Sequence, residues 1–163
     1  MKNIILIGMM GSGKSTVGRL VADRLKLTLV DTDRMIENQS GAAVRDIFAS
    51  QGEGYFRAQE AGVAAALSLR SDLVVACGGG LPLQAQAMGA LRDSGTVFWL
   101  DRDPGDIFDH VNMDYRPLGQ GTRAEFVQKA EERRDVYRAC ADYVITDFTS
   151  PISTAARIVE VFK

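Results

Sequence analysis

A glycine-rich loop near the start of the chain constrains the fold more than any other stretch. Residues 8–16 read GMMGSGKST; the apolar run 4–7 precedes them, and apolar residues at helical spacing follow from Val17 to Leu25. The loop matches the pattern GxxxxGK[ST]. Backbone N–H groups in such a loop converge on phosphate oxygens, and the following helix points its positive end at the anion. The stretch therefore predicts a strand, a phosphate-binding loop and a helix.

Each side chain of this loop has a chemical role in that interpretation. The Lys14 ammonium would lie near the β- and γ-phosphates, and the Ser15 hydroxyl is a hard oxygen ligand suited to Mg²⁺. The predicted nucleotide-binding residues are Gly11, Ser12, Gly13, Lys14, Ser15 and Thr16. A chance match within a purely structural loop is the alternative.

Short apolar runs alternate with helical patterns along the rest of the chain. The runs 4–7, 27–30, 73–76, 96–100 and 143–146 predict five strands, and the helical stretch 34–70 has breaks near Gly41 and Gly52. This alternation indicates a three-layer α/β/α domain over residues 1–163, with a mainly parallel sheet. Ligands of such sheets bind at the carboxyl ends of the strands. Asp31 and Asp33 follow the second run, and a triple glycine follows the third.

Composition narrows the class of partner. The 163 residues carry a net charge of −2, which argues against nucleic acid or an anionic membrane as the main partner. Cys77 and Cys140 are expected to be buried thiols in a reducing compartment. No apolar run approaches the length of a membrane helix, and no signal peptide is recognised before the first strand. We expect a cytoplasmic monomer whose partners are small molecules.

Six stretches, in order along nearly the whole chain, resemble the shikimate kinase family of small P-loop kinases. They are GMMGSGKSTVG (8–18), DTDRMIE (31–37), IFASQGEGYFRAQE (47–60), CGGGLP (77–82), DYRPL (114–118) and ERRDVY (132–137). The resemblance implies transfer of the ATP γ-phosphate to the 3-hydroxyl of shikimate in aromatic amino-acid biosynthesis, with Mg²⁺ as cofactor. It also implies a substrate-binding helical segment at about 34–60 and a lid at about 112–124.

The resemblance assigns roles to the acidic residues and to the glycines. Asp33 would bind the substrate hydroxyls and act in catalysis with Lys14, and Asp31 would reach Mg²⁺ together with Ser15. Backbone N–H groups of the triple glycine would face the substrate; its members are Gly78, Gly79 and Gly80. The alternative for Asp33 is an N-cap of the following helix, formed by Thr32 or Asp33.

The resemblance also assigns three arginines. Arg57, held by Glu60, and Arg133 would grip the substrate carboxylate, because guanidinium groups form forked hydrogen bonds with carboxylates. Arg116 in the lid would contact the nucleotide and the transferring phosphate. The alternatives are a surface ion pair for Arg57, a solvated helix position for Arg133 and a mobile surface loop for Arg116.

The sequence departs from the family pattern in places. His110 stands where the family often has an arginine near the nucleotide base, with base contact and an exposed helix position both open. Asp135 and Val136 replace the usual Pro-Leu before Tyr137. The segment of the lid that follows Leu118 is also short. Residues 149–151 are a candidate adenine contact.

Two other functions stay open at this stage. A related kinase could use the same loop and lid on gluconate or a nucleoside monophosphate. A regulatory module could bind nucleotide without turnover.

Overall fold

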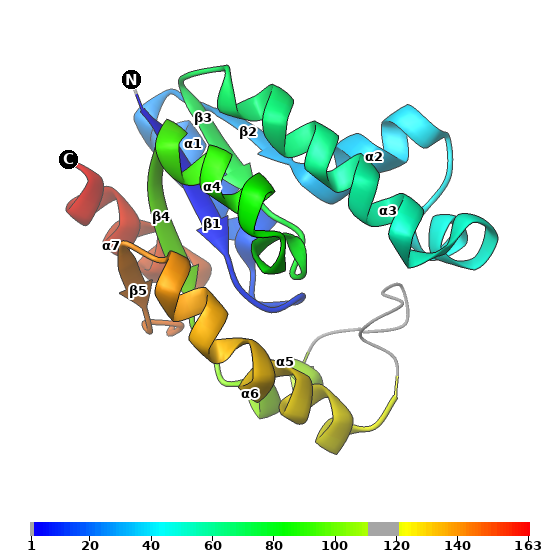
Figure 1. The fold of residues 1–163 in the computed structure, drawn as a ribbon. Helices are drawn as coiled ribbons and strands as arrows, with labels where there is room; N and C mark the ends of the chain where they lie inside the picture. The colour runs from blue at the N-terminus through cyan, green and yellow to red at the C-terminus, as the bar shows by residue number, and fades with distance from the viewer. Residues whose placement is uncertain (1, 111–120) are drawn as a thin grey trace.

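A sheet of five parallel strands forms the centre of the protein (Figure 1). The computed structural model describes residues 2–110 and 121–163. The strands are β1 (Asn3–Ile7), β2 (Thr28–Asp31), β3 (Leu73–Ala76), β4 (Gly95–Leu100) and β5 (Tyr143–Ile145). Their order in the sheet is β2-β3-β1-β4-β5, so the strand before the glycine loop is central. The five predicted strands are confirmed, and their ends differ by at most one residue from the predicted ends.

Helices connect the strands, as the alternating pattern predicted. They are α1 (Lys14–Leu25), α2 (Thr32–Ser40), α3 (Val44–Ser68), α4 (Ala85–Ser94), α5 (Pro104–His110), α6 (Arg123–Cys140) and α7 (Pro151–Phe162). A short 3₁₀ helix, η1 (Leu81–Leu83), precedes α4. None of these helices, within the residues that the structure describes, is both long and apolar enough to cross a membrane.

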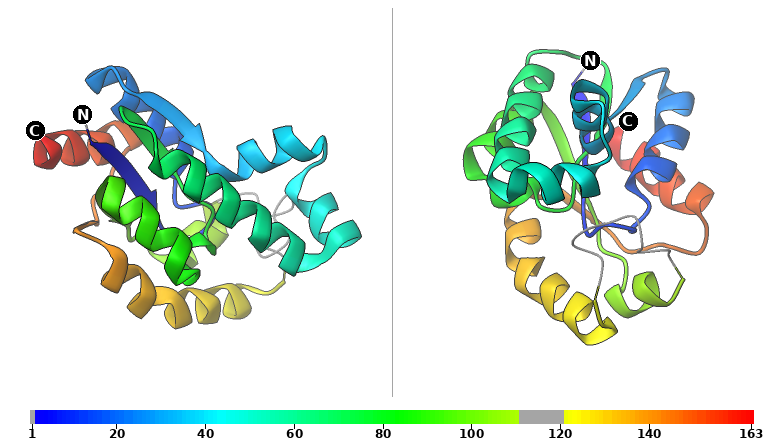
Figure 2. Two further views of the ribbon diagram at one scale, coloured as in Figure 1. Left: turned by 45° about the horizontal axis from the view of Figure 1, so that its top comes forward. Right: turned by 90° about the vertical axis from the view of Figure 1, so that its right-hand side faces the viewer.

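The two faces of the sheet bury alternate residues of the same strands. Ile4 and Leu6 of β1 pack with α1 and α7, whereas Ile5 and Ile7 pack in the core formed with α3, α4 and α6. This alternation follows from the period of two in a strand. Figure 2 shows the resulting layers, with α1 and α7 on one face and α3 and α4 on the other. The expected three-layer α/β/α fold is confirmed.

The long helix α3 is interrupted at Gly52. This residue has φ 85° and ψ 169°, which is not helical, and the left-handed Gly41 ends α2. Both breaks were predicted from the glycines. The part of α3 after Gly52 buries Phe56, Glu60 and Leu67. It is therefore fixed to the core.

The strand register brings the loops after the strands to one edge. Leu6 pairs with Ala76, Asp31 also pairs with Ala76, and Ile7 pairs with Trp99. Consequently the glycine loop, the acidic pair, the triple glycine and the loop after β4 all leave the same edge of the sheet.

Candidate active site

The glycine loop begins where β1 ends against its neighbour β4. Gly8 has φ 148°, and a Cβ there would lie 2.8 Å from the carbonyl oxygen of Leu100. Gly13 caps α1 in a left-handed conformation, with φ 99°. Glycine has no Cβ, so it adopts a positive φ and allows close backbone contact without strain. The loop therefore presents backbone N–H groups rather than side chains at the N-terminus of α1.

Lys14 folds back over this loop. Its Nζ donates hydrogen bonds of 2.8 Å to the carbonyl oxygens of Gly8 and Met9, and the residue is 9% exposed. The Ser12 hydroxyl oxygen is also buried, and no hydrogen-bond partner for it is found among the described residues. A buried hydroxyl without a partner is costly unless a ligand satisfies it. These features are suited to an anion above the loop.

The acidic residue that caps α2 is Asp31. Its side chain accepts a hydrogen bond of 3.1 Å from the Arg34 N–H, and the Ser15 hydroxyl donates to its other oxygen. The alternative that Thr32 or Asp33 caps this helix is therefore wrong, which leaves the Asp33 carboxylate available for another role. No cluster of three or more His, Cys, Asp or Glu side chains suited to a metal ion occurs in residues 2–110 and 121–163. The Ser15 hydroxyl and the Asp31 carboxylate are hard oxygen ligands, so their chemistry fits Mg²⁺ beside a phosphate group.

The Asp33 carboxyl lies in an unusual environment. Burial, followed by the charges of Asp31 and Glu60, raises its pKa from 3.8 to about 7, although Lys14 opposes the shift. Its Oδ1 atom is buried and has no hydrogen-bond partner within the described part of the chain. A carboxyl group with a pKa near neutrality and an open acceptor is suited to a substrate hydroxyl.

The triple glycine packs directly against this carboxylate. The Gly78 N–H donates to the Thr32 hydroxyl at 2.9 Å, and a Cβ on Gly78 would lie 2.5 Å from Asp33 Oδ1. The Tyr137 hydroxyl of α6 donates a 2.6 Å hydrogen bond to the Gly79 carbonyl. Any larger residue at position 78 would displace Asp33.

Arg57 forms an ion pair that is not on the surface. Its Nη1 donates to Glu60 Oε1 at 2.8 Å, and Glu60 is fully buried and also accepts from Gln84 at 2.8 Å. Burial raises the pKa of Glu60, and the hydrogen bond from Arg57 is the largest opposing effect. A Cβ on Gly80 would lie 2.5 Å from the Arg57 guanidinium. The alternative of a surface pair is therefore wrong, because Glu60 holds Arg57 over the triple glycine.

Arg133 reaches the same place from α6. It is 7% exposed, and its Nη1 atom would be 3.4 Å from a Cβ on Gly79. This nitrogen is buried, and the described residues provide no partner for it. The alternative of a solvated helix position is wrong. Arg57 and Arg133 thus approach adjacent glycines from two different helices.

A cavity of about 490 Å³ lies above the edge of the sheet. Its lining includes all six predicted nucleotide-binding residues of the loop (Gly11, Ser12, Gly13, Lys14, Ser15 and Thr16), together with Asp31, Asp33, Gly78 and Gly79. Three predicted residues are not part of this lining but lie next to Gly78 and Gly79: Gly80, Arg57 and Arg133. Arg116 and residues 112–120 of the expected lid lie outside the described residues.

The positions that depart from the family pattern have different surroundings. The side chain of His110 is 66% exposed and its Nδ1 lies 2.9 Å from Asp106, so the described structure places it outside the cavity lining. Asp135 is 99% exposed, and Val136 packs against the core. Thr149, Ser150 and Pro151 do line the cavity.

Sequence reasoning missed residues whose role depends on distant contacts. Gln84 contacts Glu60 across 24 positions, and Arg102 lines the cavity after β4. The available signals were a polar residue four positions after the triple glycine, Gln84, and a cation two positions after a strand, Arg102.

Comparisons with known proteins agree with this geometry. A family model described as shikimate kinase matches residues 10–163. A shikimate kinase of Sulfurihydrogenibium sp. is 38% identical over 100% of this chain and 99% of its own length, and one of Symbiobacterium thermophilum is 41% identical over 97% and 94%. The solved structure of shikimate kinase from Acinetobacter baumannii in complex with shikimate has a TM-score of 0.91 and 35% identity, over 99% of this chain and 92% of that one. With this arrangement of loop, carboxylate and paired arginines, the chain belongs to the shikimate kinase family.

Proposed function

We propose that this protein transfers the γ-phosphate of ATP to the 3-hydroxyl of shikimate. The observation that carries the proposal is the approach of Arg57 and Arg133 to adjacent glycines, Gly79 and Gly80, beside Asp33 and the glycine loop. Two guanidinium groups suit one carboxylate, and a carboxylate with an open acceptor suits a hydroxyl. Shikimate carries both groups on a rigid ring.

In this proposal each residue acts through position and charge. Asp33 accepts a hydrogen bond from the attacking hydroxyl and orients it, since phosphoryl transfer depends mostly on positioning and on stabilisation of charge. Lys14 leaves its present contacts with Gly8 and Met9 to pair with the phosphates. Ser15 and Asp31 would hold Mg²⁺ beside the phosphates, where the ion would supply neutralising positive charge.

Arg116 is proposed as the lid cation that stabilises charge on the transferring phosphate. The proposal rests on the RPL motif at residues 116–118. An arginine that reaches developing charge in this way contributes factors of about 10³ or more to the rate.

The test is acceptor-dependent ADP release by the purified protein with MgATP, with shikimate, gluconate and AMP added separately. Release with shikimate alone is expected. Release with gluconate or AMP instead would keep the nucleotide site and overturn the acceptor. ATP binding without release in the presence of any acceptor would favour the regulatory module.

We further propose that the protein works in the cytoplasm as a monomer. The two thiols, Cys77 and Cys140, are buried and form no disulfide in the described residues, which is compatible with a reducing compartment. Light scattering of the purified protein tests the monomer, and a mass corresponding to a dimer would overturn it.

A further inference from the structure

A forked ion pair ties helix α6 to the end of strand β4. Arg134 Nη1 donates to Asp101 Oδ1 at 3.0 Å, and Arg134 Nη2 donates to Asp101 Oδ2 at 3.3 Å. The two side chains are 31% and 18% exposed, so the pair is partly buried. A fork of two parallel hydrogen bonds restricts the orientation of both groups more than a single contact does. The pair therefore restricts how α6 can turn relative to the sheet.

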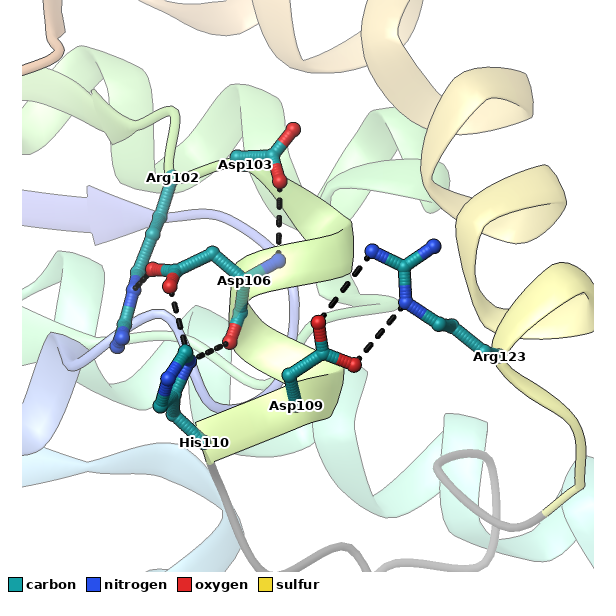
Figure 3. Close-up of polar contacts among 6 residues, drawn as sticks. All are labelled: Arg102, Asp103, Asp106, Asp109, His110 and Arg123. Atoms are coloured by element: carbon teal, nitrogen blue, oxygen red, sulfur yellow. Dashed lines mark hydrogen bonds and ion pairs between the residues drawn. The ribbon is translucent and has the colours of Figure 1, made fainter.

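Asp101 is a fixed point of attachment. It directly follows β4, and its N–H donates a 3.0 Å hydrogen bond to the carbonyl oxygen of Ile145 in β5. The next residue, Arg102, turns toward α5, where its Nε donates to Asp106 Oδ2 at 2.8 Å (Figure 3). Asp101 and Arg102 thus hold two different helices, and the sheet itself holds the carboxylate that binds Arg134.

The guanidinium of Arg134 also lies over an aromatic ring. Its central carbon is 5.1 Å from the centroid of the Trp99 ring, and Trp99 is only 3% exposed. The ring of Tyr137 lies 5.8 Å from the same indole. Arg134 and Tyr137 are three residues apart, so both lie on the side of α6 that faces β4. A cation over a desolvated indole is a favourable contact, which reinforces the fork.

Arg133 leaves α6 in another direction. Consecutive residues of an α-helix are separated by about 100° around its axis. Arg133 is 7% exposed, and its buried Nη1, for which the described residues provide no partner, would be 3.4 Å from a Cβ on Gly79. The hydrogen bond from Tyr137 to Gly79 fixes one point of α6, and a helix held at one point can still turn. The contact between Arg134 and Asp101 supplies a second point.

A further ion pair of α6 lies too far away to take over this task. Arg123, the first residue of α6, donates from Nε to Asp109 Oδ1 of α5 at 3.0 Å (Figure 3). The two side chains are 56% and 47% exposed, and exposed ion pairs contribute little to structure. Arg123 also lies ten residues before Arg133, or about 15 Å along the helix.

We propose that Arg134 is a positioning residue for the acceptor. Its fork with Asp101 and its stack on Trp99 fix the rotation of α6, and this rotation holds the Arg133 guanidinium toward the acceptor carboxylate. The inference rests on the proposed function, since it takes Arg133 to bind that carboxylate. Arg134 acts only through Arg133, because its own guanidinium is bound to Asp101.

The first test separates the two substrates by steady-state kinetics. For Arg134→Gln the KM for shikimate should rise about five- to tenfold, with kcat and the KM for ATP within about twofold of the wild type. Arg134→Lys keeps the charge without the fork and should recover only part of the loss. Arg138→Gln is the matched control: Arg138 lies 5.9 Å from the same indole, is 60% exposed, and pairs with Asp135 instead of Asp101. It should leave both KM values unchanged.

Three kinetic results would overturn the positioning role. They are an unchanged KM for shikimate in a folded Arg134→Gln protein, an equal rise for shikimate and ATP, and a loss of thermal stability without the difference between the two KM values. A double variant tests the route. Arg133→Ala combined with Arg134→Gln should have the kcat/KM for shikimate of Arg133→Ala alone. Additive losses would show that Arg134 does not act through Arg133.

The second test needs neither substrate. Trp99 is the single tryptophan of the chain, so its fluorescence reports on the contact between α6 and β4. Asp101→Asn leaves the groups that cover the indole in place but breaks the ion pair, and quenching by acrylamide should increase. Asp135→Asn, which removes the carboxylate beside Arg138, is the control. Unchanged quenching in Asp101→Asn would overturn the inference. A wild type that fails to phosphorylate shikimate would instead overturn the proposed function, and quenching would still decide whether the fork holds α6.

Discussion

The hydroxyl of Tyr137 donates a 2.6 Å hydrogen bond to the carbonyl oxygen of Gly79. This bond joins α6 to the loop after β3, and Tyr137 is only 1% exposed. Arg133 lies one helical turn before Tyr137, and its guanidinium faces the same glycine. The bond therefore determines how far α6, and with it Arg133, stands from the triple glycine.

Removal of that hydroxyl should affect substrate binding. Tyr137→Phe leaves the Gly79 carbonyl without its donor, so we expect a loss of about 1 kcal/mol in the free energy of unfolding. The KM for shikimate should rise about three- to tenfold, and the KM for ATP should change little. Urea denaturation and steady-state kinetics measure both effects. Tyr143→Phe alters a tyrosine that is 46% exposed and serves as control; an equal effect in both variants would contradict this account.

Arg57 should matter for the acceptor and not for the nucleotide. Arg57→Ala removes a charge-assisted contact worth about 1.5–3 kcal/mol, so the KM for shikimate should rise at least about tenfold. It also leaves the buried Glu60 with Gln84 as its remaining hydrogen-bond donor among the described residues, and the variant should be less stable. Arg70→Ala removes an exposed arginine just after α3 as the control. Unchanged shikimate kinetics in Arg57→Ala would refute the carboxylate clamp.

Gly80 offers a test of geometry without a change of charge. Its φ of −93° suits alanine, but the new Cβ would lie 2.5 Å from the Arg57 guanidinium and must displace it. We expect Gly80→Ala to raise the KM for shikimate several-fold in a folded protein. Gly62→Ala, within α3 and with nothing within 4 Å of the new Cβ, should instead stabilise the protein by about 0.5–1 kcal/mol without a kinetic effect.

The raised pKa of Asp33 predicts two effects of pH. The folded protein without ligands holds a proton on Asp33 between pH 3.8 and about 7, where the unfolded chain has lost it. Asp33 therefore makes its whole contribution to the free energy of unfolding below pH 3.8, and this contribution is lost as the pH rises to about 7. Denaturation at several pH values should show that the free energy of unfolding of Asp33→Asn lacks this decrease between pH 3.8 and about 7.

Activity should have the opposite dependence on pH. In the proposed reaction the ionised Asp33 accepts a hydrogen bond from the substrate hydroxyl, so kcat/KM for shikimate should increase with pH and level off above about 7. A profile that is flat between pH 5.5 and 8 would show that Asp33 does not titrate in the free enzyme.

The contact between Ser15 and Asp31 predicts the response to magnesium. Chelation by EDTA should abolish activity, and Ser15→Ala should need a higher concentration of free Mg²⁺ for half-maximal rate, by about tenfold. A titration of the rate with Mg²⁺ at constant ATP measures this shift. Ser68→Ala, which alters a partly exposed serine at the end of α3, is the control; equal magnesium curves for Ser15→Ala and wild type would exclude Ser15 as a ligand.

The fold was predictable because its signals are local. Strand periodicity, the glycine loop and the breaks at Gly41 and Gly52 each depend on a few neighbouring residues, and the parallel sheet then brings their loops to one edge. The burial of Glu60 was not predictable, since it depends on packing of α3 against η1 and α4. The N-cap was assigned to the wrong residues for a similar reason, because Asp31 and Thr32 are both capping types.

The position of Arg102 at the cavity was not predictable for another reason. The residue belongs to no motif, and it reaches the cavity because strand order places the end of β4 beside the glycine loop. Sequence periodicity gives the number of strands but not their order. The expectation that His110 contacts the nucleotide base came from resemblance alone. In the structure the His110 side chain is largely exposed, and its Nδ1 lies 2.9 Å from Asp106.

The break at Gly52 has a consequence for how relatives of this protein can diverge. It separates a first part of α3, which carries Ile47 near α2, from a second part that carries Arg57 and Glu60 and is anchored in the core. Insertions or shape changes between Gly41 and Gly52 can therefore be absorbed without a shift of Arg57. The segment between Gly41 and Gly52, which contains none of the proposed site residues, is the natural place to exchange when the surroundings of the acceptor are to be redesigned around an unchanged set of those residues.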